Sequence, residues 1–267
     1  MTMEGWDCHA HVFGPYDRFP LAPARSYTPP PATQQDYLTL LDRLGLGHGV
    51  LVHASAYGDD HALLFDALAA HERLRGVIVV GPGYSDLEGL RARGVRGARF
   101  SHRSGAGANF AGSASFEDLV AMADALARAK LHAELWTDSK ALCAIADDVR
   151  RLPVAVVVDH MGGFDAAAGL DDPGFRALLS LVETGRVWVK LCAYRNLMTA
   201  RMDAGRPFHR ALLEANPTRL VWGSDWPHLR VAPSPDAAQL LQTFRDWTGD
   251  PSLIERILVT NPKELYQ

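Results

Sequence analysis

The most constraining feature of this 267-residue chain is the regular alternation of short apolar runs with longer stretches of helical periodicity. Eight of the runs have the length and the apolar or β-branched content of buried strands. They are Gly5–Val12, His48–His53, Arg75–Val80, Arg96–Phe100, His132–Trp136, Val154–Asp159, Val187–Leu191 and Leu220–Gly223. Strands separated by helices predict a parallel sheet, because parallel neighbours need a long crossover connection.

Between these runs, apolar residues recur three and four positions apart, as on one face of a helix. The clearest helical stretches are Gln34–Leu44, Phe116–Lys130, Ser139–Arg150, Gly174–Glu183, Pro207–Ala215 and Pro235–Trp247. Repeated strand-then-helix units predict a (β/α)8 TIM barrel that occupies residues 1–267 as a single domain. A doubly wound open sheet is the alternative. It is disfavoured because no glycine-rich phosphate turn follows the first strand.

Composition excludes several classes of function. Apolar residues make up 48% of the chain, and the net charge of −4 gives no basic field for nucleic acid. No apolar run reaches the length of about 18 residues that a membrane span needs. The first residues lack the basic and apolar segments of a signal peptide. Three widely spaced cysteines favour reduced thiols, so we expect a cytoplasmic protein with no nucleic-acid or membrane partner.

Two segments are irregular. Residues 14–33 follow the first strand and contain six prolines, which is typical of an ordered lid or binding loop in a compact domain. The segment Ser104–Ser115, rich in glycine and alanine, follows the fourth strand, and we expect it to be flexible.

Polar residues stand at the ends of three predicted strands. His9 and His11 are two positions apart in the first strand, so their side chains project from the same face. His160 follows the sixth strand and Asp225 the eighth, so the strand ends of a barrel would bring all four together. Packed histidines and a helix-capping aspartate are the structural alternatives. The grouping predicts a site that polarises an oxygen and moves a proton.

Three arginines suggest the kind of substrate. Arg99, Arg103 and Arg195 lie in or after the fourth and seventh strands. Arginine binds carboxylates bidentately, so their grouping indicates a small anionic substrate such as a dicarboxylate, although each alone is typical of a surface ion pair. Ser55 and Tyr27 could donate further hydrogen bonds. Lys190, inside the seventh strand, is predicted first as a structural ion pair and second as a site residue.

These motifs resemble those of the amidohydrolase superfamily. The segments are Asp7-Cys8-His9-Ala10-His11, Tyr27-Thr28-Pro29-Pro30, Val158-Asp159-His160-Met161-Gly162 and Gly223-Ser224-Asp225-Trp226-Pro227-His228. They are similar to the amidohydrolase-2 branch, and within it most of all to the 2-pyrone-4,6-dicarboxylate lactonase family. The resemblance implies a hydrolase that opens a carboxylated lactone in the breakdown of aromatic acids.

The same resemblance implies a role for each site residue. His9, His11 and His160 would polarise the lactone carbonyl. Asp225 would take a proton from water and return it to the leaving oxygen. The substrate carboxylates would be held by Arg99 and Arg195, with help from Ser55 and Tyr27, and with Arg103 as a looser match.

The resemblance also implies that no metal cofactor is required. The fourth strand offers neither the lysine nor the carboxylate that binuclear relatives use, so a binuclear centre is not expected. A single zinc ion held by His9, His11 and Asp225 stays open. So do a sugar-lactone or muconolactone lactonase and a zinc-dependent decarboxylase or C–C hydrolase. A barrel that only binds its ligand is disfavoured because the candidate base is present. The sequence leaves the oligomeric state open.

Overall fold

The computed structural model describes residues 4–105, 110–198 and 200–267. Part of the segment predicted to be flexible, residues 106–109, therefore lies outside the described residues, as do residues 1–3. Eight strands form one parallel sheet in sequence order, and each predicted strand is found within two residues at either end. They are β1 (Trp6–Ala10), β2 (His48–Val52), β3 (Leu74–Ile78), β4 (Val95–His102), β5 (His132–Thr137), β6 (Val156–Val158), β7 (Val187–Leu191) and β8 (Leu220–Trp222).

The sheet closes on itself just beyond β8. The backbone N–H of His11 donates to the carbonyl of Trp226 at 2.8 Å, and the N–H of Asp225 donates to the carbonyl of His9 at 2.8 Å. Gly223 permits this approach, because a Cβ there would lie 2.6 Å from the Cβ of His9. The closed barrel confirms the predicted fold class over the open sheet.

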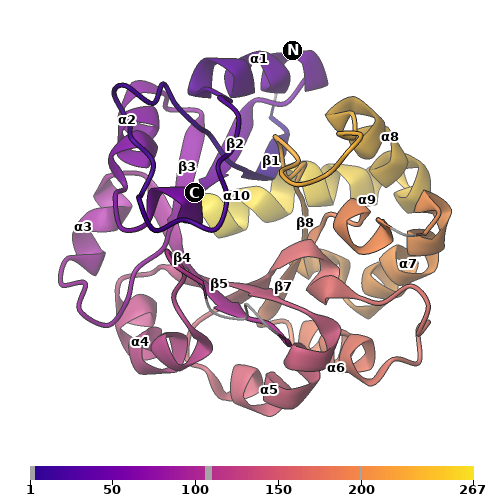
Figure 1. Ribbon diagram of the computed structural model, residues 1–267. Helices are drawn as coiled ribbons and strands as arrows, with labels where there is room; N and C mark the ends of the chain where they lie inside the picture. The colour runs from indigo at the N-terminus through magenta and orange to yellow at the C-terminus, as the bar shows by residue number, and fades with distance from the viewer. Residues whose placement is uncertain (1–3, 106–109, 199) are drawn as a thin grey trace.

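Helices surround the barrel, as Figure 1 shows. They are α1 (Gln34–Leu44), α2 (Ala62–Ala70), α3 (Leu87–Ala92), α4 (Phe116–Arg128), α5 (Ser139–Arg151), α6 (Pro173–Glu183), α7 (Arg206–Ala215), α8 (Ala237–Thr248), α9 (Pro251–Glu255) and α10 (Asn261–Tyr266). The six predicted helices are confirmed within two residues at each end. Ser115 caps α4 through a reciprocal pair with Asp118.

The last helix covers the end of the barrel at which the strands begin. Tyr266 of α10 stacks on Trp6 at 6.0 Å between ring centroids and meets the edge of His132 at 5.3 Å. Both contacted residues open their strands, so this end is filled with aromatic rings. His132 therefore lies at the end of the barrel away from the strand ends that carry the candidate site.

The proline-rich segment 14–33 is tied to the barrel at several points. Phe13 and Ala32 pair through two backbone hydrogen bonds of 2.6 and 2.9 Å at the two ends of the loop. The N–H of Ala22 donates to the carbonyl of Ala56 at 2.9 Å. These bonds hold an ordered loop over the strand ends.

Two further sequence expectations concern the chain as a whole. In the part of the chain that the structure describes, no helix combines the length and apolar character needed to cross a membrane. Cys8, Cys143 and Cys192 are free, and Cys8 and Cys192 are buried. The thiols are therefore unpaired, as the odd and widely spaced cysteines predicted.

Candidate active site

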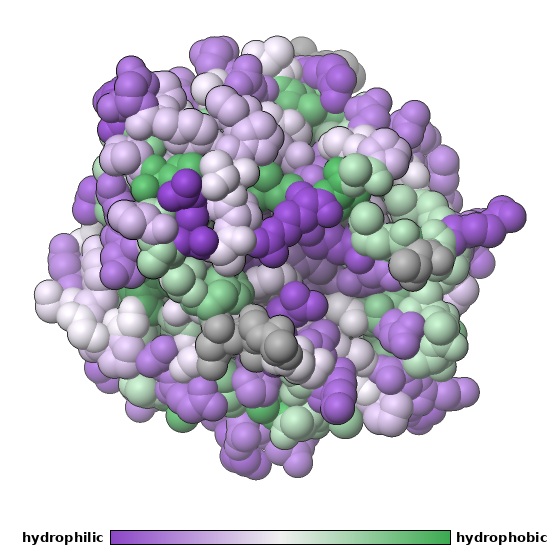
Figure 2. Space-filling view, viewed as in Figure 1, coloured by the Kyte–Doolittle hydropathy of each residue, from purple (hydrophilic) through white to green (hydrophobic). Residues whose placement is uncertain are grey.

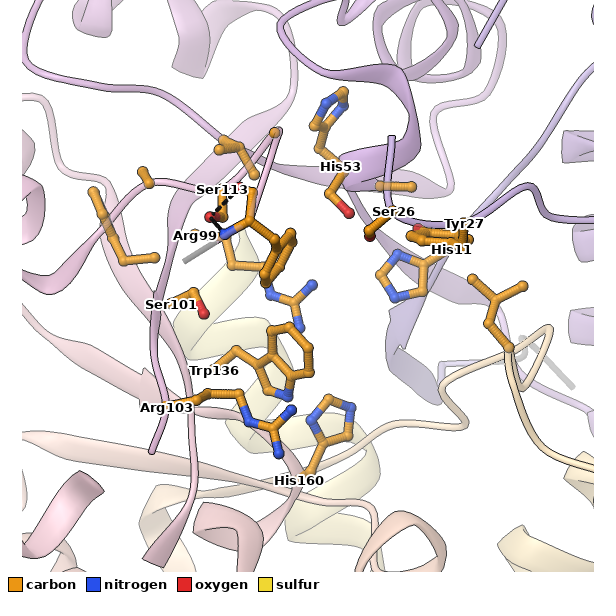
Figure 3. Close-up of a pocket in the computed structure, with 18 of the residues that line it drawn as sticks. His11, Ser26, Tyr27, His53, Arg99, Ser101, Arg103, Ser113, Trp136 and His160 are labelled. Atoms are coloured by element: carbon orange, nitrogen blue, oxygen red, sulfur yellow. Dashed lines mark hydrogen bonds between the residues drawn. The ribbon is translucent and has the colours of Figure 1, made fainter. Parts of the chain in front are cut away.

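A pocket of about 360 Å³ opens at the carboxyl ends of the strands. Seen from this side, hydrophilic side chains gather at the hollowed centre of the molecular face (Figure 2). Eight of the candidate residues named from the sequence border the pocket, whereas His9 and Lys190 do not: they are His11, Tyr27, Ser55, Arg99, Arg103, His160, Arg195 and Asp225. In Figure 3, His11, Arg99 and His160 point toward a common space.

Asp225 is the centre of the site. Its Oδ1 atom lies 3.6 Å from Nε2 of His9 and 3.6 Å from Nε2 of His11. Its Oδ2 atom lies 3.5 Å from Nε2 of His160. All four side chains are buried, so the structure brings together the residues that the sequence placed at three separate strand ends.

The two carboxylate oxygens of Asp225 have different partners. Oδ2 accepts hydrogen bonds from the Tyr194 hydroxyl at 2.7 Å and from Nε of Arg195. Oδ1 has no hydrogen-bond partner among the described atoms. Burial alone would raise the pKa of Asp225, but the charges of Arg195 and His160 hold it well below its usual range. Asp225 is therefore ionised, with one oxygen free to accept a proton.

The backbone that carries the site is unusual. Asp225, His160 and Met161 have φ angles of 58°, 48° and 54°. This left-handed region is unfavourable for residues other than glycine, and each such position costs about 1–3 kcal/mol. His160, after β6, and Asp225, after β8, are thus held in turns that direct their side chains toward one another.

The imidazoles of His9 and His11 are neutral. Burial, together with the charge of Lys190, holds the pKa of His9 well below its usual range, and burial lowers the pKa of His11. Nδ1 of His11 lies 2.8 Å from the carbonyl oxygen of Val52, which fixes the ring. A carboxylate among neutral imidazoles is suited to accepting a proton from water and stabilising an oxygen that gains charge.

The amidohydrolase family of the amidohydrolase-2 type matches this chain over residues 6–267. The chain belongs to that family. A curated relative, 4-sulfomuconolactone hydrolase of Rhizobium radiobacter, is 34% identical over 98% of this chain and 89% of its own length. A 2-pyrone-4,6-dicarboxylate hydrolase of Comamonas testosteroni is 33% identical over 97% of this chain and 89% of its own.

A solved structure supports the same assignment. It is an Acinetobacter baumannii protein described as a "probable 2-pyrone-4,6-dicarboxylic acid hydrolase" with citric acid bound. It superimposes with a TM-score of 0.82 at 26% identity and covers 99% of this chain and 99% of its own. The expected amidohydrolase resemblance is confirmed across nearly the whole barrel.

A layer of buried charges lies beneath the pocket of this amidohydrolase. Lys190 donates to Oε2 of Glu134 at 2.5 Å and lies 3.5 Å from Oδ1 of Asp159. Arg99 donates to Oδ2 of Asp159 through Nε at 3.0 Å and through a terminal nitrogen at 2.8 Å. Two cations and two anions therefore balance in the barrel interior, and the ion pair predicted for Lys190 is present.

The arginines differ in how freely they face the pocket. Arg99 is held against Asp159, with its side chain 15% exposed. Arg103 stacks over Trp136 at 4.6 Å and is 41% exposed. Arg230, which the sequence interpretation did not single out, borders the pocket from the loop after β8 and lies 4.9 Å over the Tyr27 ring. The pocket wall is therefore strongly cationic.

The donor atoms have the spacing of a metal site. Nε2 of His9 lies 3.3 Å from Nε2 of His11, and each lies 3.6 Å from Oδ1 of Asp225. Zinc bonds of about 2.0–2.2 Å in a tetrahedron separate ligand atoms by roughly this much. His9 with His160 and Asp225 forms a second close group. The other nitrogen of His9, Nδ1, lies 3.1 Å from Nζ of Lys190 and 3.3 Å from Oδ1 of Asp159, so its shorter contact is with a donor, where a metal-bound histidine needs an acceptor.

Sequence reasoning missed Tyr194 and Arg230 and gave no role to Asp159. Tyr194 lies in a short turn next to Arg195, and only the fold shows that its hydroxyl reaches Asp225. Arg230 belongs to an irregular stretch without periodicity. The available signal for Asp159 was a carboxylate directly after an apolar strand, beside His160.

Proposed function

We propose that this amidohydrolase hydrolyses a lactone bearing two anionic groups, with 2-pyrone-4,6-dicarboxylate as the leading candidate, in the breakdown of aromatic acids. The observation that carries the proposal is a buried Asp225 carboxylate among three imidazoles at the base of an arginine-lined pocket. The names of the two curated relatives support it, since both denote lactone hydrolases. The unpaired cysteines are consistent with a cytoplasmic enzyme.

Asp225 acts as the base in this reaction. A water molecule at the pocket floor gives a proton to Oδ1, the oxygen that accepts no hydrogen bond from the described residues. The water oxygen attacks the lactone carbonyl carbon, and the carbonyl oxygen gains negative charge. Tyr194 and Arg195 hold the other carboxylate oxygen, so the base keeps its orientation while the proton moves.

The imidazole cluster stabilises the carbonyl oxygen as its charge develops. His11 and His160 border the pocket, whereas His9 lies fully buried beneath them. When the tetrahedral intermediate collapses, the bond to the ring oxygen breaks. Protonated Asp225 then returns its proton to that oxygen, which completes hydrolysis and regenerates the carboxylate. Each of these steps uses only side chains of this chain.

The pocket wall favours a substrate with more than one anionic group. Arg103 and Arg230 are contributed by loops that follow different strands, so they can hold two groups on one ring. Tyr27 and Ser55 add neutral donors beside them. Both lactones named for the relatives carry acidic substituents, and the Acinetobacter structure holds citric acid, a tricarboxylate.

The test is hydrolysis of 2-pyrone-4,6-dicarboxylate by enzyme treated with a chelator and dialysed, followed through loss of the ring absorbance. Turnover that Asp225→Asn abolishes supports the proposal. If the wild-type enzyme does not hydrolyse this lactone but does hydrolyse 4-sulfomuconolactone, the proposed reaction stands and the proposed substrate changes. The identity of 34% to the Rhizobium enzyme makes that lactone the second candidate. If the enzyme hydrolyses neither of the two lactones, with or without added zinc, the proposal is overturned.

A further inference from the structure

Lys190 is the buried cation that the proposed reaction does not use. Its side chain has no exposed surface and lies between the carboxylates of Glu134 and Asp159. Its Nζ atom also lies 3.1 Å from Nδ1 of His9. Because an ammonium group can only donate, this contact requires an unprotonated Nδ1 on His9.

The opposite end of the histidine pair is fixed independently. Nδ1 of His11 lies 2.8 Å from the carbonyl oxygen of Val52, and a carbonyl can only accept. The proton of the neutral His11 ring is therefore on Nδ1, and its Nε2 atom carries a lone pair. That lone pair faces Nε2 of His9 at 3.3 Å.

Only one tautomer of His9 satisfies both neighbours. With the proton on Nε2, His9 accepts from Lys190 and donates to His11. With the proton on Nδ1, two donors would face each other at 3.1 Å and two lone pairs at 3.3 Å. Asp159 offers an acceptor to Nδ1 at 3.3 Å, but Lys190 occupies the shorter contact.

We infer that Lys190 is a positioning residue that locks His9 as the Nε2–H tautomer and so opposes metal binding at His9, His11 and Asp225. A metal ligand must offer a lone pair, and in this tautomer the Nε2 lone pair of His9 is replaced by a proton. Metal-bound histidines usually donate their other N–H to a carboxylate, a role that Asp159 could take only without Lys190.

The same chain of hydrogen bonds divides the imidazoles by task. His9 and His11 are committed to each other along the path from Lys190 to Val52. Both ring nitrogens of His160 lack a hydrogen-bond partner among the described atoms. His160 is then the imidazole that donates to the substrate oxygen. This consequence rests on the proposed hydrolysis, whereas the tautomer of His9 does not.

Nitrogen NMR of the 15N-labelled wild-type enzyme tests the tautomer directly. The His9 signals are assigned by their loss in His9→Gln, and protonated and unprotonated ring nitrogens have well separated shifts. We expect an unprotonated Nδ1 and a protonated Nε2. A proton on Nδ1 would overturn the inference, whatever the enzyme's substrate.

Zinc affinity supplies the second measurement. The double variant Lys190→Met/Glu134→Gln removes one cation and one anion together, and Glu134→Gln alone is the matched control that keeps Lys190. Competition with a chromophoric chelator should show zinc binding at least about tenfold tighter in the double variant than in the control. Equal affinities in two folded variants would contradict the role of Lys190. If the double variant does not fold, the wild-type spectrum still decides.

Discussion

Arg195 donates from Nε to Oδ2 of Asp225, the carboxylate proposed as the base. The same guanidinium reaches the carbonyl of Leu229 at 3.3 Å and borders the pocket. Arg195 is therefore placed to contact both Asp225 and an anionic group that enters the pocket. The strength of the base and the binding of substrate are coupled through one side chain.

Replacement of the base is the first prediction. Asp225→Asn keeps the shape of the side chain but removes the proton acceptor, so kcat should fall by at least about 100-fold. The exposed Asp171 on the surface gives a matched control, because Asp171→Asn changes the same charge at a side chain that is 95% exposed. Steady-state kinetics and thermal unfolding of both variants check the expectation. Substantial activity in a folded Asp225→Asn enzyme would rule out this base.

Removal of Arg195 should move the pH dependence. In the wild-type enzyme the charge of Arg195 helps to hold the pKa of Asp225 well below its usual range, so we expect activity to persist to low pH. Without that cation, Asp225 becomes protonated at higher pH. In Arg195→Gln the acid limb of the kcat/KM profile should therefore shift to higher pH by about 1–3 pH units. Profiles of both enzymes, extended down to the lowest pH at which each stays folded, measure the shift. An unmoved acid limb would show that Arg195 does not control the base.

Arg103 should affect substrate binding more than chemistry. Its nearest carboxylate, on Asp138, is 3.9 Å away, so little structure depends on it. Loss of a charge-assisted contact to a substrate anion in Arg103→Gln should raise KM about 10-fold or more and leave kcat within a few-fold. Arg176→Gln, at a surface pair with Asp171, is the control. A selective loss of kcat would contradict this role.

Gly223 should be intolerant of even one added carbon. A Cβ at this position would lie 2.6 Å from the Cβ of His9, in a barrel wall that cannot move freely. Gly223→Ala is expected to cost about 1–3 kcal/mol of unfolding free energy and to lower activity by displacing His9. Gly83→Ala, where nothing lies within 4 Å, is the control. Denaturant unfolding compares them, and equal stabilities would refute the close contact.

Asp7 should make stability depend on pH. Burial raises its pKa from 3.8 to about 6, although hydrogen bonds from Ser224 oppose the rise. The folded state therefore binds a proton more tightly than the unfolded state. Stability from this group falls as pH rises from about 4 to 6, by about 3 kcal/mol in all. Asp7→Asn should remove that part of the slope in urea unfolding at several pH values, and an unchanged slope would exclude Asp7 as its source.

Much of this barrel could be predicted because strand and helix periodicities are local. The helix α2 (Ala62–Ala70) was not singled out, since its residues are apolar on nearly every side and show no stripe. The helix α3 (Leu87–Ala92) is only six residues long. Both elements are specified by their position between strands rather than by their own pattern.

The site was predictable where strand ends carry polar residues, as at His9 and Asp225. It was not predictable where contacts depend on distances across the barrel. The approach of Lys190 to His9 joins residues 181 positions apart, and no sequence pattern reports which ring nitrogen it meets. The protonation of the site therefore follows from the fold alone.

The pairing of Phe13 with Ala32 has a consequence for how this enzyme could acquire new substrates. The two ends of the proline-rich loop are fastened together, so this pairing itself does not depend on the number of residues between them. The entropy of closing such a loop changes slowly with its length. Insertions or deletions among residues 17–31 could therefore reshape the rim that carries Tyr27 while the residues that transfer the proton stay in place. This loop is a suitable segment to vary in directed evolution.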